Sequence, residues 1–171
     1  MKRNFLWFLS FALLSTALTL TSCDDDPCKD VECGANGTCF DGVCQCNEGY
    51  EGTNCELEWT AKFLGSYNVE DVCTGENPGT YLYETTISKV DDMTLRISNF
   101  AGFNQSLNVT VSRETASSST ADKISFTNVT DASNRVFNGE GTISGSTITI
   151  TYTVTFSDNT EDSCTATYIR K

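Results

Sequence analysis

Six of the nine cysteines in this chain are crowded between residues 28 and 55, and this crowding constrains the fold more than any other feature. The segment between them is rich in turn formers, including Asn36-Gly37 and Asp41-Gly42. So short a segment cannot bury enough core to fold alone, so disulfides must hold it together. Six cysteines can pair in many ways, and spacing alone does not choose among them. The six are Cys28, Cys33, Cys39, Cys44, Cys46 and Cys55, with gaps of four, five, four, one and eight residues.

The end of this segment carries a specific signature. It reads Cys46-Asn47-Glu48-Gly49-Tyr50-Glu51-Gly52-Thr53-Asn54-Cys55, with a glycine, an aromatic residue, a second glycine and the final cysteine. The spacing and this ending are similar to an EGF-like domain, which would occupy residues 28–56. The resemblance implies three disulfides and a role as a spacer or protein-contact module. The implied pairs are Cys28–Cys39, Cys33–Cys44 and Cys46–Cys55.

Some EGF-like domains bind calcium, so the resemblance raises this question here. Asp24, Asp26 and Asp41 offer part of the usual carboxylate set, but Pro27 stands where the calcium-binding type has Glu or Gln. Calcium takes about six to eight oxygen ligands, and this segment is short of them. We therefore expect no cofactor and no metal, with calcium at these three aspartates as the less favoured alternative.

The first 22 residues read as a signal peptide. A basic start, Met1-Lys2-Arg3, precedes an uncharged and mostly apolar run over residues 5–20. This run is shorter than the ~20 apolar residues of a membrane-spanning helix, which is the alternative interpretation. The ending Leu20-Thr21-Ser22-Cys23 resembles the bacterial lipobox. That resemblance implies cleavage before Cys23 and attachment of acyl chains, such as palmitate, to this residue. The membrane is then a partner, bound through a lipid anchor.

An acidic tether of residues 23–27 follows, with Asp24, Asp25 and Asp26 directly after the lipidation site. This cluster resembles the surface-export signal of Bacteroidetes lipoproteins, which implies the bacterial cell envelope and the outer, exposed face of the outer membrane. The rule known from enteric bacteria instead implies retention at the inner membrane. A solvated spacer without any signal is the third interpretation, and all three stay open.

Composition narrows the range of functions. The net charge of −12 disfavours binding to nucleic acid, because the phosphate backbone repels an acidic surface. The chain has no histidine, the commonest general base and the commonest zinc ligand. No nucleophile, base and orienting group stand at a recognisable spacing. We therefore expect a protein that is not an enzyme, whose partner is an unidentified extracellular or envelope protein or glycan.

Residues 59–171 read as an all-β domain. The clearest segment runs from Thr147 to Phe156, where apolar side chains alternate with threonines and predict a strand with one buried face. Short connections rich in Gly, Asn, Asp and Ser separate similar segments, which together predict eight antiparallel strands. The other seven lie near residues 64–73, 80–90, 93–100, 106–113, 122–129, 135–143 and 162–169.

Cys73 and Cys164 remain after the lipid anchor and the six clustered cysteines are assigned. They lie in the first and last predicted strands, and a disulfide requires Cα atoms within about 7 Å. The first and last strands must therefore meet, which favours a closed eight-stranded barrel over the alternative, a β-sandwich. The opening at residues 59–67, with Phe63-Leu64-Gly65-Ser66-Tyr67, weakly resembles the Gly-x-Trp start of lipocalin-like barrels, with Tyr67 in place of Trp.

Two functions stay open for this domain. The preferred one is a surface binding or adhesion module carried on the EGF-like spacer. The alternative, implied by the lipocalin-like resemblance, is a small-molecule carrier that uses the barrel interior. Eight strands leave an interior little wider than their own side chains, so a packed core is favoured over a ligand cavity. The candidate inward-facing contacts are Tyr81, Tyr83, Phe126, Tyr152 and Phe156.

The lipid anchor is directly testable. Replacement of Cys23 by alanine removes the thiol that accepts the diacylglycerol, so we expect an unlipidated precursor that keeps its signal peptide. Metabolic labelling with a palmitate analogue and the mass of the product check this. Cleaved protein released from the membrane would show that Cys23 is not the anchor.

Overall fold

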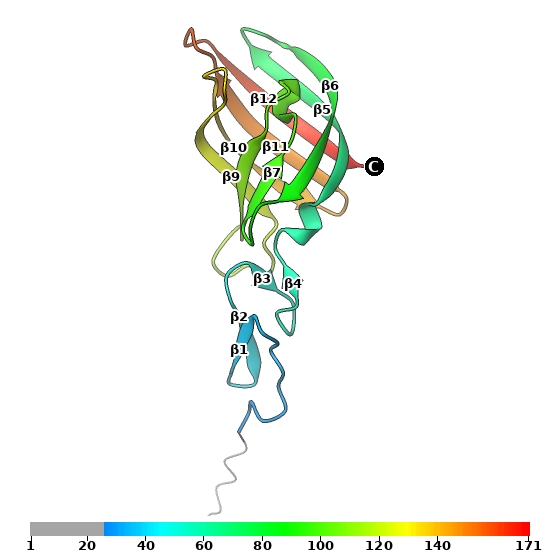
Figure 1. The fold of residues 1–171 in the computed structure, drawn as a ribbon, viewed down its shortest axis with the longest axis vertical. Coiled ribbons are helices and arrows are strands. Elements are labelled where there is room, and N and C mark those ends of the chain that lie inside the picture. Colours follow the sequence, from blue (N-terminus) through cyan, green and yellow to red (C-terminus); the bar gives the residue numbers. More distant parts are fainter. Residues whose placement is uncertain (1–25) are drawn as a thin grey trace, which may run out of the picture.

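The computed structural model describes residues 26–171. The predicted signal peptide and the predicted tether residues Cys23, Asp24 and Asp25 lie outside this range. The described chain is elongated, with a small disulfide-rich unit at one end of the long axis and a β-barrel at the other (Figure 1). No helix within residues 26–171 is long and apolar enough to cross a bilayer.

The small unit is built from two short hairpins. A turn at Asp41-Gly42 joins the strands of the first hairpin, and both residues have the positive φ that a tight two-residue turn requires. Three disulfides link Cys28 to Cys39, Cys33 to Cys44 and Cys46 to Cys55, the pairs that the EGF-like resemblance implies. The strands are β1 (Gly37–Phe40), β2 (Val43–Cys46), β3 (Tyr50–Glu51) and β4 (Leu57–Glu58).

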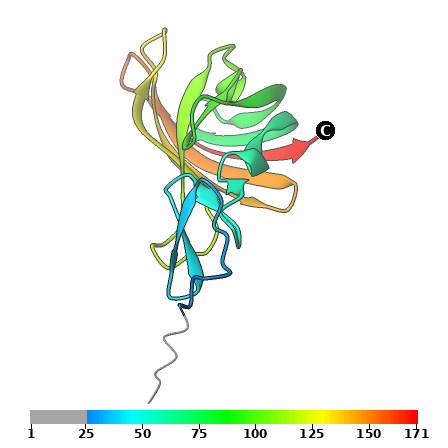
Figure 2. The same ribbon diagram turned by 60° about the horizontal axis from the view of Figure 1, so that its bottom comes forward.

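The large unit is a closed antiparallel barrel of eight strands, so the fold class predicted from the sequence is confirmed and the sandwich alternative is wrong. Strands consecutive in sequence are neighbours, and β12 pairs with β5 to close the ring (Figure 2). The strands are β5 (Gly65–Gly75), β6 (Gly79–Lys89), β7 (Thr94–Ile97), β8 (Leu107–Ser112), β9 (Lys123–Thr130), β10 (Val136–Ser144), β11 (Thr147–Thr155) and β12 (Glu161–Arg170).

A disulfide joins the two strands that close the barrel. Cys73 and Cys164 are directly opposite one another in the β5–β12 ladder, with their Cα atoms 4.1 Å apart. Their bond closes a loop that contains almost the whole barrel, a sequence separation of 91 residues. The cross-link therefore acts at the point where the barrel would otherwise open.

The interior of the barrel follows the period of two expected from the sequence. On β11, Ile148, Ile150, Tyr152 and Val154 are buried, while the threonines between them lie on the outer face. Phe156 lies just beyond the strand and is half-buried. The interior beside the EGF-like unit is filled by aliphatic and aromatic side chains, so this part of the barrel is a packed core.

A short 3-10 helix, η1 (Ala61–Phe63), closes this end of the barrel. Phe63 is fully buried, and its carbonyl oxygen accepts a hydrogen bond from the Tyr67 hydroxyl at 2.7 Å. Arg170, at the end of the last strand, donates to the same hydroxyl at 2.9 Å and to the Lys62 carbonyl. Tyr67, the residue that replaces the expected Trp, thus ties the first strand to η1 and the last strand.

The EGF-like unit is docked onto the closed end of the barrel by a buried ion pair. The Glu51 carboxylate of β3 lies 2.6 Å from Nζ of Lys62 and accepts a hydrogen bond from the Ala121 backbone N–H at 2.8 Å. Lys62 also pairs with Asp122 at 2.8 Å. Because Glu51 is buried, its charge requires these partners, and they fix the unit against η1 and the β8–β9 loop.

Trp59 reinforces this connection. Its backbone N–H donates to the Gly49 carbonyl at 2.9 Å and its indole N–H donates to the Tyr50 carbonyl at 2.8 Å. A second ion pair lies beside it, where Lys89 of β6 contacts both Glu58 and Asp92. The two units therefore meet through directional contacts at several points, which dock the EGF-like unit onto the barrel.

The barrel disulfide predicts a stability effect. Replacement of both Cys73 and Cys164 by serine releases a long loop in the unfolded chain, which in the chain-entropy model costs about 4 kcal/mol. We expect the melting temperature of the barrel to fall by about 15 °C, measured by near-ultraviolet circular dichroism of residues 24–171. Thr74→Ser, on the outer face of the same strand, is the control. An unchanged melting temperature would contradict the predicted role of the disulfide.

Candidate functional site

The end of the barrel away from the EGF-like unit is hollow. A cavity of about 460 Å³ lies between β5, β6, β11 and β12 and the loops that follow them, and we call it the mouth cavity. Its inner wall is formed by the buried residues Asp71, Cys73, Tyr152, Val154 and Cys164. Its rim is formed by more exposed residues, which include Asn77, Tyr81, Phe156, Asp158 and Thr160.

The five aromatic contacts predicted from the sequence have three different positions in the structure. Tyr81, Tyr152 and Phe156 line the mouth cavity. Tyr83 lies beside it, because its hydroxyl donates to the Asp71 carboxylate that lines the cavity. Phe126 does not line the cavity and belongs to the packed core of the barrel. Its ring packs edge-on against the Phe100 ring, with the ring centres 5.4 Å apart.

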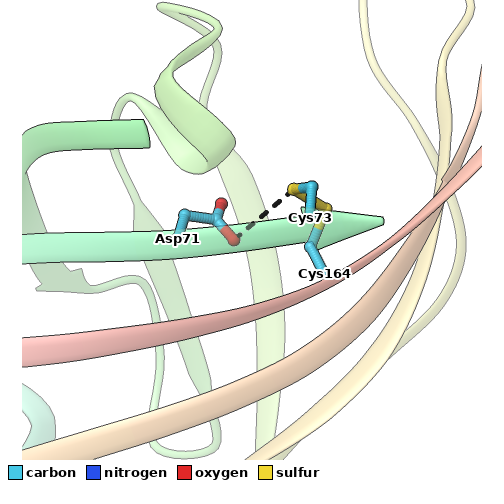
Figure 3. Close-up of side chains that lie close together, drawn as sticks. All are labelled: Asp71, Cys73 and Cys164. Atoms are coloured by element: carbon cyan, nitrogen blue, oxygen red, sulfur yellow. Dashed lines mark hydrogen bonds between the residues drawn. A yellow bond between two sulfur atoms is a disulfide. The ribbon is translucent and has the colours of Figure 1, made fainter. Parts of the chain in front are cut away.

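Asp71 is the most unusual residue of this site, because it is a carboxylate inside a barrel and only 1% exposed. Its Oδ2 accepts hydrogen bonds from the Tyr152 hydroxyl at 2.5 Å and from the Tyr83 hydroxyl at 3.2 Å. Its Oδ1 faces the sulfur of Cys73 at 3.8 Å, on the same face of β5 (Figure 3). That sulfur belongs to a disulfide and carries no proton, so this contact is not a hydrogen bond.

The group of Asp71, Cys73 and Cys164 brings together three potential metal ligands, the one such group within residues 26–171 (Figure 3). Both sulfurs are bonded to one another, so neither is a thiolate that could bind a metal. A single carboxylate then remains, which is far short of the oxygen ligands that calcium or magnesium requires. This arrangement is a buried carboxylate beside a disulfide.

Burial decides the protonation behaviour of this cluster. It raises the pKa of Asp71 above its ordinary value, although the hydrogen bonds from Tyr152 and Tyr83 act in the opposite direction. Burial also raises the pKa of Tyr152 and Tyr83, and the negative charge of Asp71 adds to the effect. Tyr168 is fully buried next to them. Within residues 26–171, no lysine or arginine forms an ion pair with Asp71.

Two further aspartates line the cavity. Asp162 is buried, and its carboxylate accepts hydrogen bonds from the backbone and the side-chain amide of Asn77, at 2.9 and 3.1 Å. Asp158 is exposed on the β11–β12 turn, where hydrogen bonds from Thr160 lower its pKa. All charged side chains that line the mouth cavity are therefore acidic.

The remaining wall comes from the segment around η2 (Phe100–Gly102), which plugs part of the barrel mouth. The Phe100 ring is buried between the rings of Phe126, Phe137 and Tyr152. Ala101 and Phe103 face the cavity, and the Arg135 guanidinium stacks on the Phe103 ring at 3.7 Å. Four residues of this segment have positive φ angles: Asn99, Gly102 and Asn104, which adopt this conformation readily, and Ala101, for which it is strained.

Asp71 was not predicted as a site residue, although the sequence contains a pattern that could have identified it. Tyr67, Val69, Asp71 and Cys73 alternate with exposed residues along the first predicted strand, so Asp71 stands in phase with its buried face. An acidic residue at such a position requires a reason.

The calcium candidates lie apart from this cavity, in the EGF-like unit. Oδ1 of Asp26 accepts a hydrogen bond from the Cys28 N–H at 2.9 Å, and Asp41 is exposed at the tip of the first hairpin. The third candidate, Asp24, lies outside the described residues. The two described aspartates belong to no group of three potential ligands within residues 26–171. The expectation that this unit binds no metal stays a prediction, with calcium as the less favoured alternative.

The EGF-like unit has recognisable relatives among known proteins. Residues 28–58 match the family described as the Teneurin-like EGF domain. The Neurogenic locus notch homolog protein of Giardia intestinalis is 35% identical over 71 residues, which are 42% of this chain and 10% of that protein. The chain thus spans about a tenth of the length of the relative that it matches. The N-terminal unit is EGF-like.

Three solved structures resemble this chain only distantly. A redesigned β-barrel is 20% identical, with 66% of this chain and 94% of that chain covered and a TM-score of 0.45. EF1p2_mFAP2b bound to DFHBI is 14% identical, with coverages of 64% and 94% and a TM-score of 0.47. A protein of unknown function from Bacteroides ovatus is 16% identical, with coverages of 64% and 42% and a TM-score of 0.42. Likenesses this remote carry no conclusion about a ligand.

The raised pKa of Asp71 predicts a pH-dependent stability effect. Above this pKa the ionised carboxylate destabilises the fold, whereas below the ordinary aspartate pKa of about 3.9 it is protonated in both states and has no effect. Asp71→Asn keeps an acceptor for Tyr152 and removes the charge. We expect the variant to melt several degrees above the parent at about pH 7.5, with the difference shrinking as the pH falls. Thermal melts between about pH 4 and pH 8 measure this.

Glu70→Gln is the matched control, because Glu70 is the neighbouring residue of the same strand and lies on the outer face of the barrel. The melting temperature of Glu70→Gln should equal that of the parent protein across this pH range. A lower or equal melting temperature for Asp71→Asn at about pH 7.5 would show that the carboxylate does not carry a burial penalty.

Proposed function

We propose that this chain is a lipid-anchored envelope protein whose barrel is a non-catalytic module that binds a small molecule in the mouth cavity. The observation that carries the proposal is the cavity itself. Its volume falls within the range of ordinary ligand sites, and its lining combines apolar and aromatic side chains with a few polar groups. The carrier function, the less favoured alternative at the level of sequence, is the one that this geometry supports.

The position of the cavity agrees with an anchored protein. The described chain begins at the end of the EGF-like unit that lies farthest from the barrel (Figure 1). The residues that line the cavity lie at the end of the barrel away from the EGF-like unit. An anchor at Cys23 would then hold the EGF-like unit near the membrane and leave the mouth cavity facing away from it. The ion pairs at Glu51 and Lys89 connect the spacer to the barrel, and a junction held in this way would keep the cavity at a fixed distance from the membrane.

Adhesion through the EGF-like unit is the second candidate. Its first hairpin exposes Phe40 and Val43 next to the turn, at 65% and 67% exposure. Two neighbouring exposed apolar side chains at a hairpin tip are suited to contact with a protein partner. They lie far from the mouth cavity, so one experiment can separate the two functions.

The test is a screen of small molecules of mixed charge against residues 24–171, followed by amide NMR. We expect ligands to shift the signals of cavity residues such as Ala101, Phe103 and Phe156, while the signals of Phe40 and Val43 stay in place. Ser157→Trp, on the exposed turn at the cavity rim, should block binding. Ser146→Trp, on the exposed turn at the other end of β11, should leave binding unchanged.

Absence of any ligand from such a screen would contradict a small-molecule site. So would ligands that shift the outer surface and are insensitive to Ser157→Trp. In either case the exposed hairpin becomes the remaining candidate surface.

A further inference from the structure

The mouth cavity has an electrostatic imbalance. Its inner wall holds Asp71, and further out lie Asp162 and Asp158, while no lysine or arginine is among its lining residues. Asp162 and Asp158 have hydrogen-bond donors in Asn77 and Thr160 and need no further partner. Asp71 differs from them, because both of its hydroxyl donors, Tyr83 and Tyr152, reach the same oxygen, Oδ2, whereas each oxygen of the buried Asp162 carboxylate has its own donor.

A buried carboxylate without a cation is costly for the fold. The usual solution in proteins is an ion pair with Arg or Lys, and none is formed with Asp71 within the described chain. No O–H or N–H group of residues 26–171 donates to its Oδ1. One oxygen of a cavity-lining carboxylate is therefore left without a donor, and the site lacks a positive charge.

The rest of the lining is suited to the body of an organic ligand. Tyr81, Phe103, Tyr152 and Phe156 supply aromatic rings, and Val154 and Ala101 supply apolar surface. Aromatic faces attract organic cations through the ring quadrupole. One face of the Phe103 ring is already covered by the Arg135 guanidinium, so the rings of Tyr81, Tyr152 and Phe156 are the main aromatic surfaces left for a ligand.

We propose that the mouth cavity binds an organic ammonium ion, with the charged nitrogen paired to Asp71 and an apolar or aromatic body packed against the rings of the rim. This inference rests on the proposed function and specifies its ligand. A bare metal ion would leave the apolar wall unused and find too few oxygen ligands. An anion would be repelled by all three aspartates.

The test compares three molecules of similar shape on residues 24–171 by isothermal titration calorimetry at about pH 7.5. They are 2-phenylethylamine, which is a cation, 2-phenylethanol, which is neutral, and 3-phenylpropionate, which is an anion. We expect the amine to bind about 10- to 100-fold more tightly than the alcohol, because a hydrogen bond to a charged group replaces a neutral one. The anion should bind most weakly.

Two variants locate the charge that is recognised. Asp71→Asn should reduce the affinity for 2-phenylethylamine by at least about tenfold and leave that for 2-phenylethanol almost unchanged. Glu70→Gln removes the same charge from the outer face of the same strand and should preserve both affinities. Because Asp71→Asn is expected to be the more stable protein, a loss of binding by this variant is not explained by unfolding.

The outcomes separate this inference from the proposed function. Equal affinities of the amine and the alcohol, both blocked by Ser157→Trp, would overturn the cation site and retain a small-molecule cavity. Tight amine binding that survives Asp71→Asn would also overturn it. Binding of none of the three, together with an empty screen, would contradict the proposed function itself.

Discussion

The structure depends on the pairing of the first and last barrel strands. Strands β5 and β12 form a continuous antiparallel ladder from Tyr67 to Gly75, and the disulfide between Cys73 and Cys164 fixes this ladder near its distal end. Without this pairing the sheet would have two open edges, and the side chains of its inner face would lose their shared interior. Closure therefore creates both the packed core and the cavity above it.

The two ends of the barrel then have different roles. At the end beside the EGF-like unit, η1, Tyr67 and Arg170 close the interior, and Glu51 and Lys62 dock the small unit onto it. At the other end, η2 fills only part of the opening, with Phe100 packed among core aromatics. The space that η2 does not fill is the mouth cavity, and the buried carboxylate of Asp71 lies on its wall. A small barrel can thus be packed and hollow at once, in different halves.

Much of the fold could be predicted from the sequence, because it depends on the alternation of apolar and polar residues along each strand and on the disulfide between the first and last strands. The alternation around Tyr152 identifies a strand, and the positions of Cys73 and Cys164 in the first and last strands require closure. The docking of Glu51 could not be predicted, since its partners Lys62 and Ala121 come together only through the tertiary fold and a lone glutamate usually stands in solvent. The cavity could not be predicted either, because its wall includes the segment around Asn99 and Ala101, whose backbone is irregular and leaves no repeating pattern in the sequence.

The proposed site depends on Asp71, a buried carboxylate on the wall of the mouth cavity that forms no ion pair within residues 26–171. The most direct measurement is the titration of its side-chain carboxyl carbon by NMR, in residues 24–171, with and without 2-phenylethylamine. We predict a pKa above the ordinary aspartate value of about 3.9 in the free protein, and a lower pKa when the amine is bound. An ordinary pKa that the amine leaves unchanged would contradict the proposed site.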